Sequence, residues 1–131
     1  MSRIPLVIDT SAWVRHRRPS ARPLWESAAE ADLLVACPVA TLEILRISRN
    51  EGEFEALDDN FRALRQATVT ASVCDAALTA SRELGARRRL PIADYLIAAA
   101  AAERGFGVLH ADRHFDLLAT VLPFENVRLP E

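Results

Sequence analysis

The sequence predicts a single α/β domain over residues 1–131, with a mostly parallel β-sheet of four to five strands flanked by helices on both faces. Short apolar runs rich in β-branched residues recur along the chain, and such runs are typical of strands buried on both faces. Segments with helical spacing separate these runs, which favours parallel strands joined by helices. No repeat, linker or low-complexity tract divides the chain, so we expect one domain.

Strands are predicted at the apolar runs that turn-forming residues bound. The run IPLVID (4–9) is read as a buried parallel strand, and LLVACP (33–38) is a second strand that stops at its proline. Later in the chain, GVLHA (107–111) and ENVRL (125–129) are expected to add two more. ATVTA (67–71) is a possible short strand, so the sheet has four or five.

Helices are predicted from capping residues and from apolar spacing. Thr10 or Ser11 can cap the first helix, and Ser72 can open another. Pro91 restarts a helix that Gly105 ends. The predicted helices span residues 11–18, 20–31, 39–50, 53–66, 72–89, 91–104 and 112–122.

Composition excludes several classes of protein. Half of the residues are apolar and the net charge is −2, which argues against disorder and against a strongly basic nucleic-acid coat. A catalyst of RNA cleavage needs only a local basic rim, so that class stays open. Cys37 and Cys74 lack metal-binding spacing and are expected to be buried free thiols in a reducing compartment. The apolar stretches at the N-terminus and at 93–102 are too short for a signal peptide or membrane span, so we expect a soluble cytoplasmic protein.

Two aspartates directly follow predicted strands. Asp9 closes the first strand, and Asp112 lies just past GVLHA in the stretch LHADRHFDLL. Because the functional crevice of a parallel sheet lies beyond the carboxyl ends of its strands, the two carboxylates are expected to be neighbours. Asp9 alone could simply cap the next helix, although Thr10 and Ser11 could do so in its place.

Two further carboxylates interrupt apolar helices. Asp94 lies in the first turn of LPIADYLIAAAA, a helix so apolar that burial is expected, and a buried carboxylate is costly unless it is paired or metal-bound. Glu43 interrupts VATLEILRI, where Arg46 and Arg49 are alternative ion-pair partners. If these carboxylates converge with the two at the strand ends, Mg²⁺ or Mn²⁺ would relieve their repulsion. Such a cluster suits phosphodiester hydrolysis.

The segments IPLVIDTSAW, the internal helix with Glu43, LPIADYLIAAAA and VLHADRHFDLL together resemble the PIN-domain ribonucleases, most closely the VapC-type toxins of bacterial toxin–antitoxin pairs. The resemblance covers nearly the full chain and implies a PIN-like fold. It implies that Asp9, Glu43, Asp94 and Asp112 are the catalytic quartet, binding one or two Mg²⁺ or Mn²⁺ ions. Ser11 matches a small polar residue that hydrogen-bonds around the first aspartate.

The same resemblance implies an activity and partners. The family cleaves RNA as metal-dependent endonucleases, and transfer or ribosomal RNA is the usual substrate. The resemblance also implies a small VapB-type antitoxin, which binds the toxin, inserts residues near its active site and inhibits it. The toxin is expected as a homodimer or in a toxin–antitoxin hetero-oligomer.

Two positions depart from the fuller family pattern. His110 stands where many members have Thr or Ser, and His114 stands where many have a second aspartate, so a second metal site is not assured. His114 could bind Mn²⁺, contact phosphate or cap a helix, and a supporting role is favoured. Asp116 is a further supporting candidate, although it could equally face solvent.

Two arginine clusters adjoin the proposed site elements and are candidates for RNA binding. One comprises Arg15, Arg17 and Arg18 with His16, and the other comprises Arg87, Arg88 and Arg89. Arginine forks suit phosphate, although solvated helix ends are an equally good interpretation. Trp13 and Trp25 could stack on bases or hold an antitoxin helix, but packing is favoured.

Two other functions share features of this sequence. Aspartyl-phosphate chemistry, as in receiver domains or haloacid-dehalogenase-like phosphatases, also uses an aspartate after the first strand. All 16 basic residues are arginine, whereas receivers need a lysine, and Ser11 stands where the phosphatases need a second aspartate. A PIN-like module that only binds RNA or protein would have no need to cluster four acids.

Overall fold

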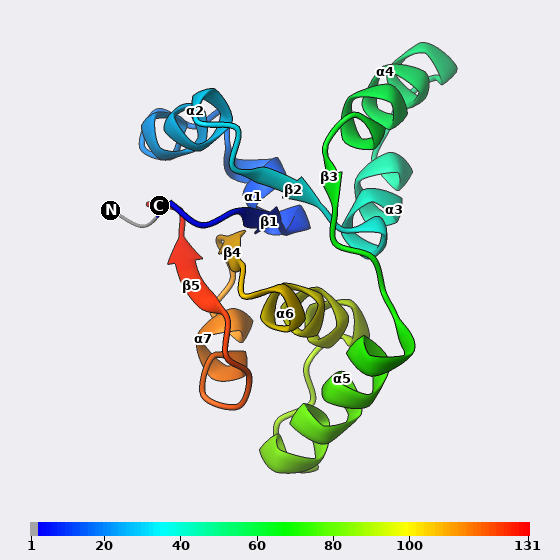
Figure 1. Ribbon diagram of the computed structural model, residues 1–131. Coiled ribbons are helices and arrows are strands. Elements are labelled where there is room, and N and C mark those ends of the chain that lie inside the picture. The colour runs from blue at the N-terminus through cyan, green and yellow to red at the C-terminus, as the bar shows by residue number, and fades with distance from the viewer. Residues whose placement is uncertain (1–2) are drawn as a thin grey trace.

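The computed structural model describes residues 3–131 and confirms the predicted fold class. Within these residues, five strands form one parallel sheet in the order β3-β2-β1-β4-β5, with seven helices around it (Figure 1). The elements in chain order are β1 (Leu6–Ile8), α1 (Thr10–Arg15), α2 (Arg22–Glu30), β2 (Leu34–Ala36), α3 (Pro38–Arg46), α4 (Glu51–Arg62), β3 (Arg65–Gln66), α5 (Ala71–Leu84), α6 (Ile92–Arg104), β4 (Gly107–His110), α7 (His114–Leu118) and β5 (Glu125–Arg128).

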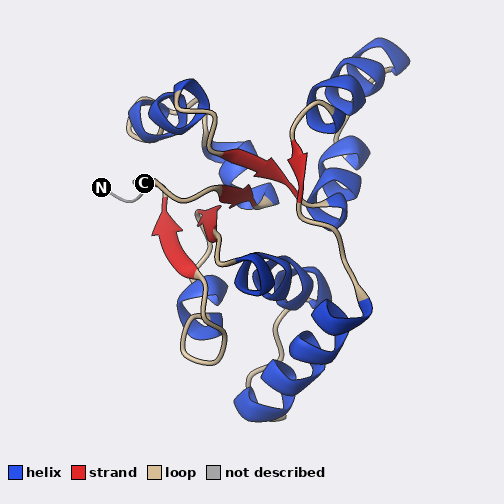
Figure 2. Cartoon of the chain, in the orientation of Figure 1, coloured by secondary structure: helices blue, strands red, loops and turns tan. Residues whose placement is uncertain are grey.

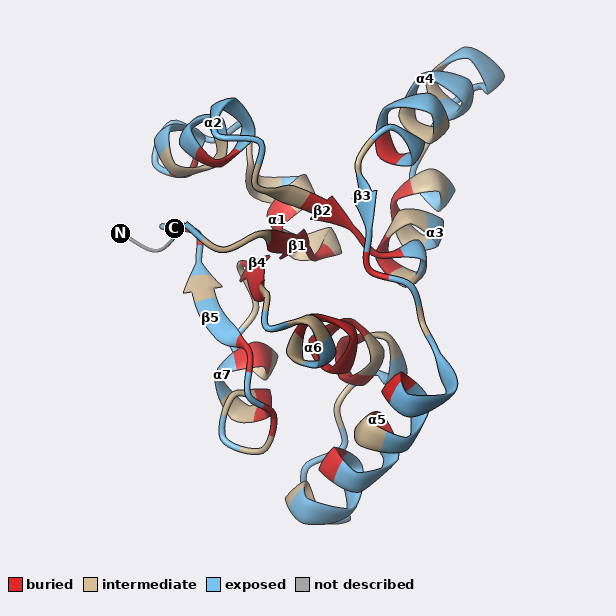
Figure 3. Ribbon diagram, viewed as in Figure 1, coloured by how far each residue is buried: buried red, intermediate tan, exposed pale blue. Residues whose placement is uncertain are grey.

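Helices cover both faces of the sheet (Figure 2). On the central strand β1, Val7 packs into one apolar cluster, whereas Leu6 and Ile8 pack into another, because successive side chains of a strand point to opposite faces. The cluster around Val7 includes buried residues of α5, α6 and α7. The other cluster includes buried residues of α1 and α2 together with Ile44 of α3 and Phe61 of α4. Helix α6 and the three central strands are the most deeply buried elements (Figure 3).

The possible short strand predicted at residues 67–71 lies earlier in the chain, as β3. Arg65 and Gln66 form it, rather than residues 67–71, and the preceding helix ends at Arg62. Register explains the difference, because Val35 and Ala36 of β2 pair with these two residues. A strand this short and exposed carries no apolar pattern that a sequence could reveal.

Helix starts also differ from their predicted positions. Of the caps considered for α1, Asp9 is the one that forms, since its side chain accepts a hydrogen bond from the Ser11 N–H, whereas Thr10 and Ser11 do not cap the helix. Thr70 rather than Ser72 caps α5. At the other boundary tested, Gly105 ends α6 in a left-handed conformation with φ 69°, as predicted.

The two cysteines have different environments. Cys37 is buried as expected, but Cys74 is exposed. The buried residues of α5 are Val73, Ala77 and Ala80, which form one stripe at helical spacing. Cys74 follows Val73 by one residue and therefore turns away from that stripe. Across residues 3–131, no helix is both long enough and apolar enough to cross a membrane.

Gly107 lets β4 lie close to both neighbouring strands. A Cβ atom there would be 2.8 Å from Leu6 Cδ2 and 2.9 Å from the Glu125 carbonyl oxygen. We expect Gly107→Ala to lower the free energy of unfolding by about 1–3 kcal/mol, because the backbone oxygen cannot move without disturbing β5. Urea denaturation measures the change.

Gly52, in the first turn of α4, provides the matched control. A Cβ atom there would meet only Asn50 Oδ1, at 3.4 Å. Gly52→Ala should be neutral or stabilise the protein by up to about 1 kcal/mol, since alanine favours a helix. Equal unfolding midpoints for the two variants would contradict the steric argument.

Candidate metal centre

The first two predicted ligands lie at one edge of the sheet. β1 and β4 are adjacent, and the Asp9 backbone N–H donates to the Leu109 carbonyl across them at 3.0 Å. The chain passes from β4 through Ala111, whose N–H donates to Ser11 Oγ at 2.9 Å. Asp9 and Asp112 therefore follow neighbouring strands at the carboxyl edge, as expected from the order of the elements.

Asp9 is buried and held by the start of α1. Its Oδ2 accepts from the Ser11 N–H at 2.9 Å and also from the Ser11 hydroxyl. Burial raises the pKa of Asp9 above its ordinary value, the hydrogen bonds from Ser11 oppose this, and the charge of Glu43 adds to the rise. Capping and ligand placement are thus compatible at this residue, because the cap uses Oδ2 alone.

Ser11 joins the two strand ends through its hydroxyl group. Ser11→Ala removes a donor to Asp9 and leaves the Ala111 N–H without its acceptor. We expect the free energy of unfolding to fall by about 1–3 kcal/mol, the usual cost of an unsatisfied buried partner. Chemical denaturation tests this, and Ser11→Thr, which keeps the hydroxyl, should recover most of the loss. Stability equal to wild type in Ser11→Ala would contradict the role.

Asp94 is placed by the start of α6. Pro91 begins this helix, and Asp94 lies in its first turn with 8 % of its surface exposed. Burial is the main cause that raises the pKa of Asp94 to about 6, followed by the nearby charge of Asp9, while His114 lowers it. The helix N-terminus favours a negative charge here, but burial and the neighbouring carboxylate outweigh it.

Glu43 reaches the same place from α3. Thr10 Oγ1 donates to Glu43 Oε1 at 2.7 Å, so Thr10 positions a predicted ligand. Sequence reasoning considered Thr10 only as a helix cap and missed this contact. Of the alternative partners for Glu43, Arg49 instead pairs with Glu53 at 3.3 Å.

The four predicted carboxylates converge on one pocket of about 370 Å³ at the carboxyl edge. It is lined by Asp9, Thr10, Ser11, Val14, Arg15, Arg18, Glu43, Pro91, Asp94 and Asp112. Elements far apart in the sequence therefore build a single site. The oxygen-rich lining fits a divalent cation, which prefers oxygen ligands. Burial, with a smaller contribution from neighbouring carboxylates, raises the pKa of Asp9 and of Asp94, and a cation would offset both effects.

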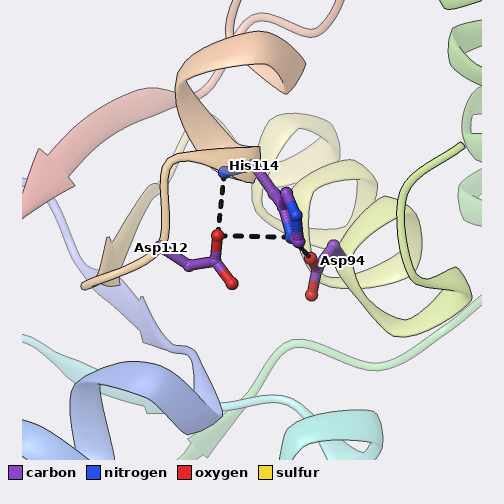
Figure 4. A group of neighbouring side chains, drawn as sticks. All are labelled: Asp94, Asp112 and His114. Carbon is purple, nitrogen blue, oxygen red and sulfur yellow. Dashed lines mark hydrogen bonds and ion pairs between the residues drawn. The ribbon is translucent and has the colours of Figure 1, made fainter. Parts of the chain in front are cut away.

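His114 lies against two of these carboxylates. Its Nδ1 is 2.9 Å from Asp94 Oδ2 and 3.2 Å from Asp112 Oδ1, as Figure 4 shows. Its backbone N–H also donates to Asp112 Oδ1 at 3.0 Å. Among the described residues, Asp94, Asp112 and His114 form a group whose ligand atoms all lie within 4.8 Å of one another.

His110 and Asp116 belong to a network beside the pocket. His110 is fully buried, and its Nδ1 accepts from the Asp112 N–H at 3.2 Å while Nε2 contacts Asn126. Burial lowers the pKa of His110. Asp116 accepts from Asn126 Nδ2 and pairs with Arg128, both at 2.8 Å. The carboxylate of Asp116 is therefore engaged by β5, whereas His110 contacts the loop that carries Asp112.

The arginine and tryptophan candidates separate by position. Arg15 and Arg18 line the carboxylate pocket, whereas Arg17 lines a neighbouring groove and Arg87 lies between α5 and α6. His16 stacks on Trp13, with ring centroids 4.5 Å apart, and makes a tilted contact with Trp25 at 4.4 Å. Trp13 also meets Phe61 of the core, so the tryptophans pack as favoured.

Comparison with known proteins gives the family. A family model described as "PIN domain" matches residues 6–121, most of the chain and all four predicted ligands. The chain belongs to the PIN-domain family. Relatives of this PIN domain include "Ribonuclease VapC18" of Mycobacterium tuberculosis, 34 % identical over 87 % of each chain. "Ribonuclease VapC51" of the same organism is 40 % identical over 88 % of this chain and 85 % of its own.

Solved structures share the PIN-domain fold at low identity. VapBC-5 of Mycobacterium tuberculosis, a member of the VapBC family of toxin–antitoxin systems, superimposes with a TM-score of 0.72 at 20 % identity over 95 % of this chain and 98 % of that one. VapBC2 of Rickettsia felis, solved with a DNA fragment from its promoter, gives 0.75 at 12 % identity over 97 % and 100 %. At these identities the likeness extends to the fold alone.

Proposed function

We propose that this PIN domain is a Mg²⁺- or Mn²⁺-dependent endoribonuclease and the toxin of a toxin–antitoxin pair. The observation that carries the proposal is the convergence of Asp9, Glu43, Asp94 and Asp112 on one pocket. Relatives named ribonucleases at 34 % and 40 % identity support the same reaction. A module that only binds RNA or protein would gain nothing from four carboxylates around one pocket, where burial raises the pKa of Asp9 and of Asp94.

Each residue has a defined task in hydrolysis of the phosphodiester bond. A bound divalent ion supplies Lewis-acid stabilisation of phosphate charge and lowers the pKa of water. Asp9, Glu43, Asp94 and Asp112 would hold it, and the hydrogen bond from Thr10 positions Glu43. Ser11 fixes the carboxylate of Asp9.

The substrate and partners follow from the pocket and its relatives. The pocket has a volume of about 370 Å³ with two arginines beside the carboxylates, and transfer or ribosomal RNA is the proposed substrate. The protein partner is a small VapB-type antitoxin that covers this pocket, since the solved relatives include members of VapBC systems. A homodimer or a toxin–antitoxin hetero-oligomer is the proposed assembly, and the cytoplasm is the proposed location.

RNA cleavage by the purified chain tests the proposal. Transfer and ribosomal RNA are incubated with the protein and Mg²⁺ or Mn²⁺, and fragment ends are mapped. Cleavage should require the ion and stop when EDTA is added, and induction in bacteria should arrest growth. Absence of cleavage with either ion on every RNA would overturn the assignment, as would activity that EDTA leaves unchanged.

Arg15 and Arg18 are expected to bind the RNA backbone, because they line the pocket beside the carboxylates. The double variant Arg15→Gln/Arg18→Gln should raise KM about tenfold with little change in kcat. It should also lower the slope of log affinity against log salt by about 1.4, the value for two phosphate contacts on a single strand.

Matched variants test whether position matters. Arg17→Gln and Arg87→Gln remove arginines outside the pocket and should have smaller effects. Arg62→Gln, on the exposed side of α4 where it pairs with Asp58, should leave KM unchanged. If substitution of Arg17 or Arg87 lowers the affinity for RNA as much as substitution of Arg15 or Arg18, the arginines act through diffuse charge and not through contacts in the pocket.

A further inference from the structure

The position of His114 sets this PIN domain apart from the pattern of two aspartates two residues apart. A carboxylate at that place would complete an all-oxygen site, but this chain carries an imidazole ring there. The ring is directed into the site, between Asp94 and Asp112 (Figure 4). Its side chain is 36 % exposed, so the ring is supported on one side and reachable from solvent on the other.

The distances around Nδ1 are those of neighbouring ligands on one ion. Two ligand atoms about 2.1 Å from an ion and at right angles to each other lie about 3.0 Å apart. Nδ1 lies 2.9 Å from Asp94 Oδ2 and 3.2 Å from Asp112 Oδ1. These two separations are therefore those of neighbouring ligands in an octahedral site, and the ligand atoms of all three side chains lie within 4.8 Å of one another.

We infer that His114 binds the metal ion through Nδ1 and that the site consequently selects a transition ion such as Mn²⁺ over Mg²⁺. This inference rests on the metal-dependent activity proposed above. To bind an ion, Nδ1 would use its lone pair, so the ring would carry its hydrogen on Nε2. Metal binding would replace the contacts of Nδ1 with Asp94 Oδ2 and Asp112 Oδ1 by ligation of one ion.

Selectivity follows from the chemistry of the donor. Mg²⁺ is a hard ion that takes oxygen ligands, whereas imidazole suits transition ions. A neutral ring in place of a carboxylate also lowers the negative charge of the site by one, which weakens purely ionic attraction. Both effects disfavour Mg²⁺ relative to Mn²⁺, and neither depends on the RNA.

The backbone supports this role for the ring. The His114 N–H donates to Asp112 Oδ1, the same oxygen that faces Nδ1. The main chain at His114 therefore holds one ligand while the side chain supplies another. Asp112 is held from its other side as well, because its own N–H donates to His110 Nδ1 at 3.2 Å.

Electron spin resonance of Mn²⁺ bound to the full-length chain tests the inference directly. Loss of the six-line signal of free Mn²⁺ gives the Kd, and electron spin echo modulation detects a nitrogen bound to the ion. Wild type should show imidazole ¹⁴N coupling, and His114→Ala should lose it with at least about tenfold weaker binding, since even outer partners of ligands are worth roughly 10–100-fold. His114→Asp should also lose the coupling and should bind Mg²⁺ more tightly relative to Mn²⁺, by about tenfold.

A second histidine variant excludes adventitious binding. His16 packs against Trp13 and Trp25, away from the carboxylates, so His16→Gln should keep both the coupling and the Kd for Mn²⁺. Bound Mn²⁺ without nitrogen coupling in wild type would overturn the inference, as would coupling that persists in His114→Ala. If wild type lacks the nitrogen coupling but still cleaves RNA with a divalent ion, the inference about His114 fails and the proposed function remains. If wild type shows the nitrogen coupling but cleaves no RNA with any ion, His114 is a ligand and the proposed function fails.

Discussion

Asp94→Asn should reduce RNA cleavage by roughly 10²–10³-fold, the usual effect of removing one electrostatic contact from a reaction centre. Asp94 is central to the pocket, because Asp9 raises its pKa and His114 contacts its Oδ2 at 2.9 Å. The amide has nearly the same shape and can still accept the hydrogen bond from His114. It lacks the charge that holds a divalent ion, so binding of Mn²⁺ should weaken together with cleavage.

The same substitution should make the ion-free protein more stable. The pKa of Asp94 rises from 3.8 to about 6, mainly because the group is buried. At pH 7 the folded protein must carry this charge at a cost of up to about 3 kcal/mol, given 1.36 kcal/mol for each pKa unit. Urea denaturation in EDTA at pH 7 should therefore give a higher midpoint for Asp94→Asn than for wild type.

Asp75 provides the control for the change in charge. It is exposed on α5, and Asp75→Asn should leave cleavage unchanged and stability within about 0.5 kcal/mol. An active, EDTA-insensitive Asp94→Asn protein would refute the proposed function. An inactive variant with lowered stability would refute only the account of burial.

The convergence of the ligands was predictable where it follows from topology. Asp9 and Asp112 each follow a buried strand, and parallel neighbours place such residues at one edge. Asp94 was recognisable because a carboxylate interrupts a helix whose other residues, from Tyr95 to Ala101, are almost all buried. In each case a carboxylate stands in or directly after an apolar, buried segment, and a functional role explains why a charged group is placed there.

Contacts between distant side chains were not predictable. The bond from Thr10 to Glu43 spans 33 residues, and nothing in either segment indicates it. Asp116 lies in the same short stretch as His114, yet Arg128 and Asn126 hold its carboxylate while His114 contacts Asp94 and Asp112. The contacts of Asp116 depend on Asn126 and Arg128 of β5, and the periodicity of the sequence carries no information about how β5 packs against this stretch.

Divalent ions should reverse the dependence of stability on pH. In the ion-free protein, Asp9 and Asp94 have pKa values raised above those of the unfolded chain, so the folded state binds protons more tightly. The stability that this contributes is fully present below about pH 4 and is lost as the pH rises through about 6. The ion-free protein should therefore become less stable between these two values.

With an ion present, the same carboxylates act in the opposite direction, because only their charged forms bind it. At pH 7, Mn²⁺ at one hundred times its Kd should add about 2.7 kcal/mol to the free energy of unfolding. This increment should shrink toward zero as Asp94 is protonated below pH 6, and Asp94→Asn should lose most of it at every pH. Urea titrations from pH 4 to 8, with EDTA or Mn²⁺ at matched ionic strength, measure both curves. Parallel curves would mean that the ion does not bind these carboxylates, whereas curves that diverge with rising pH connect their burial cost to metal binding.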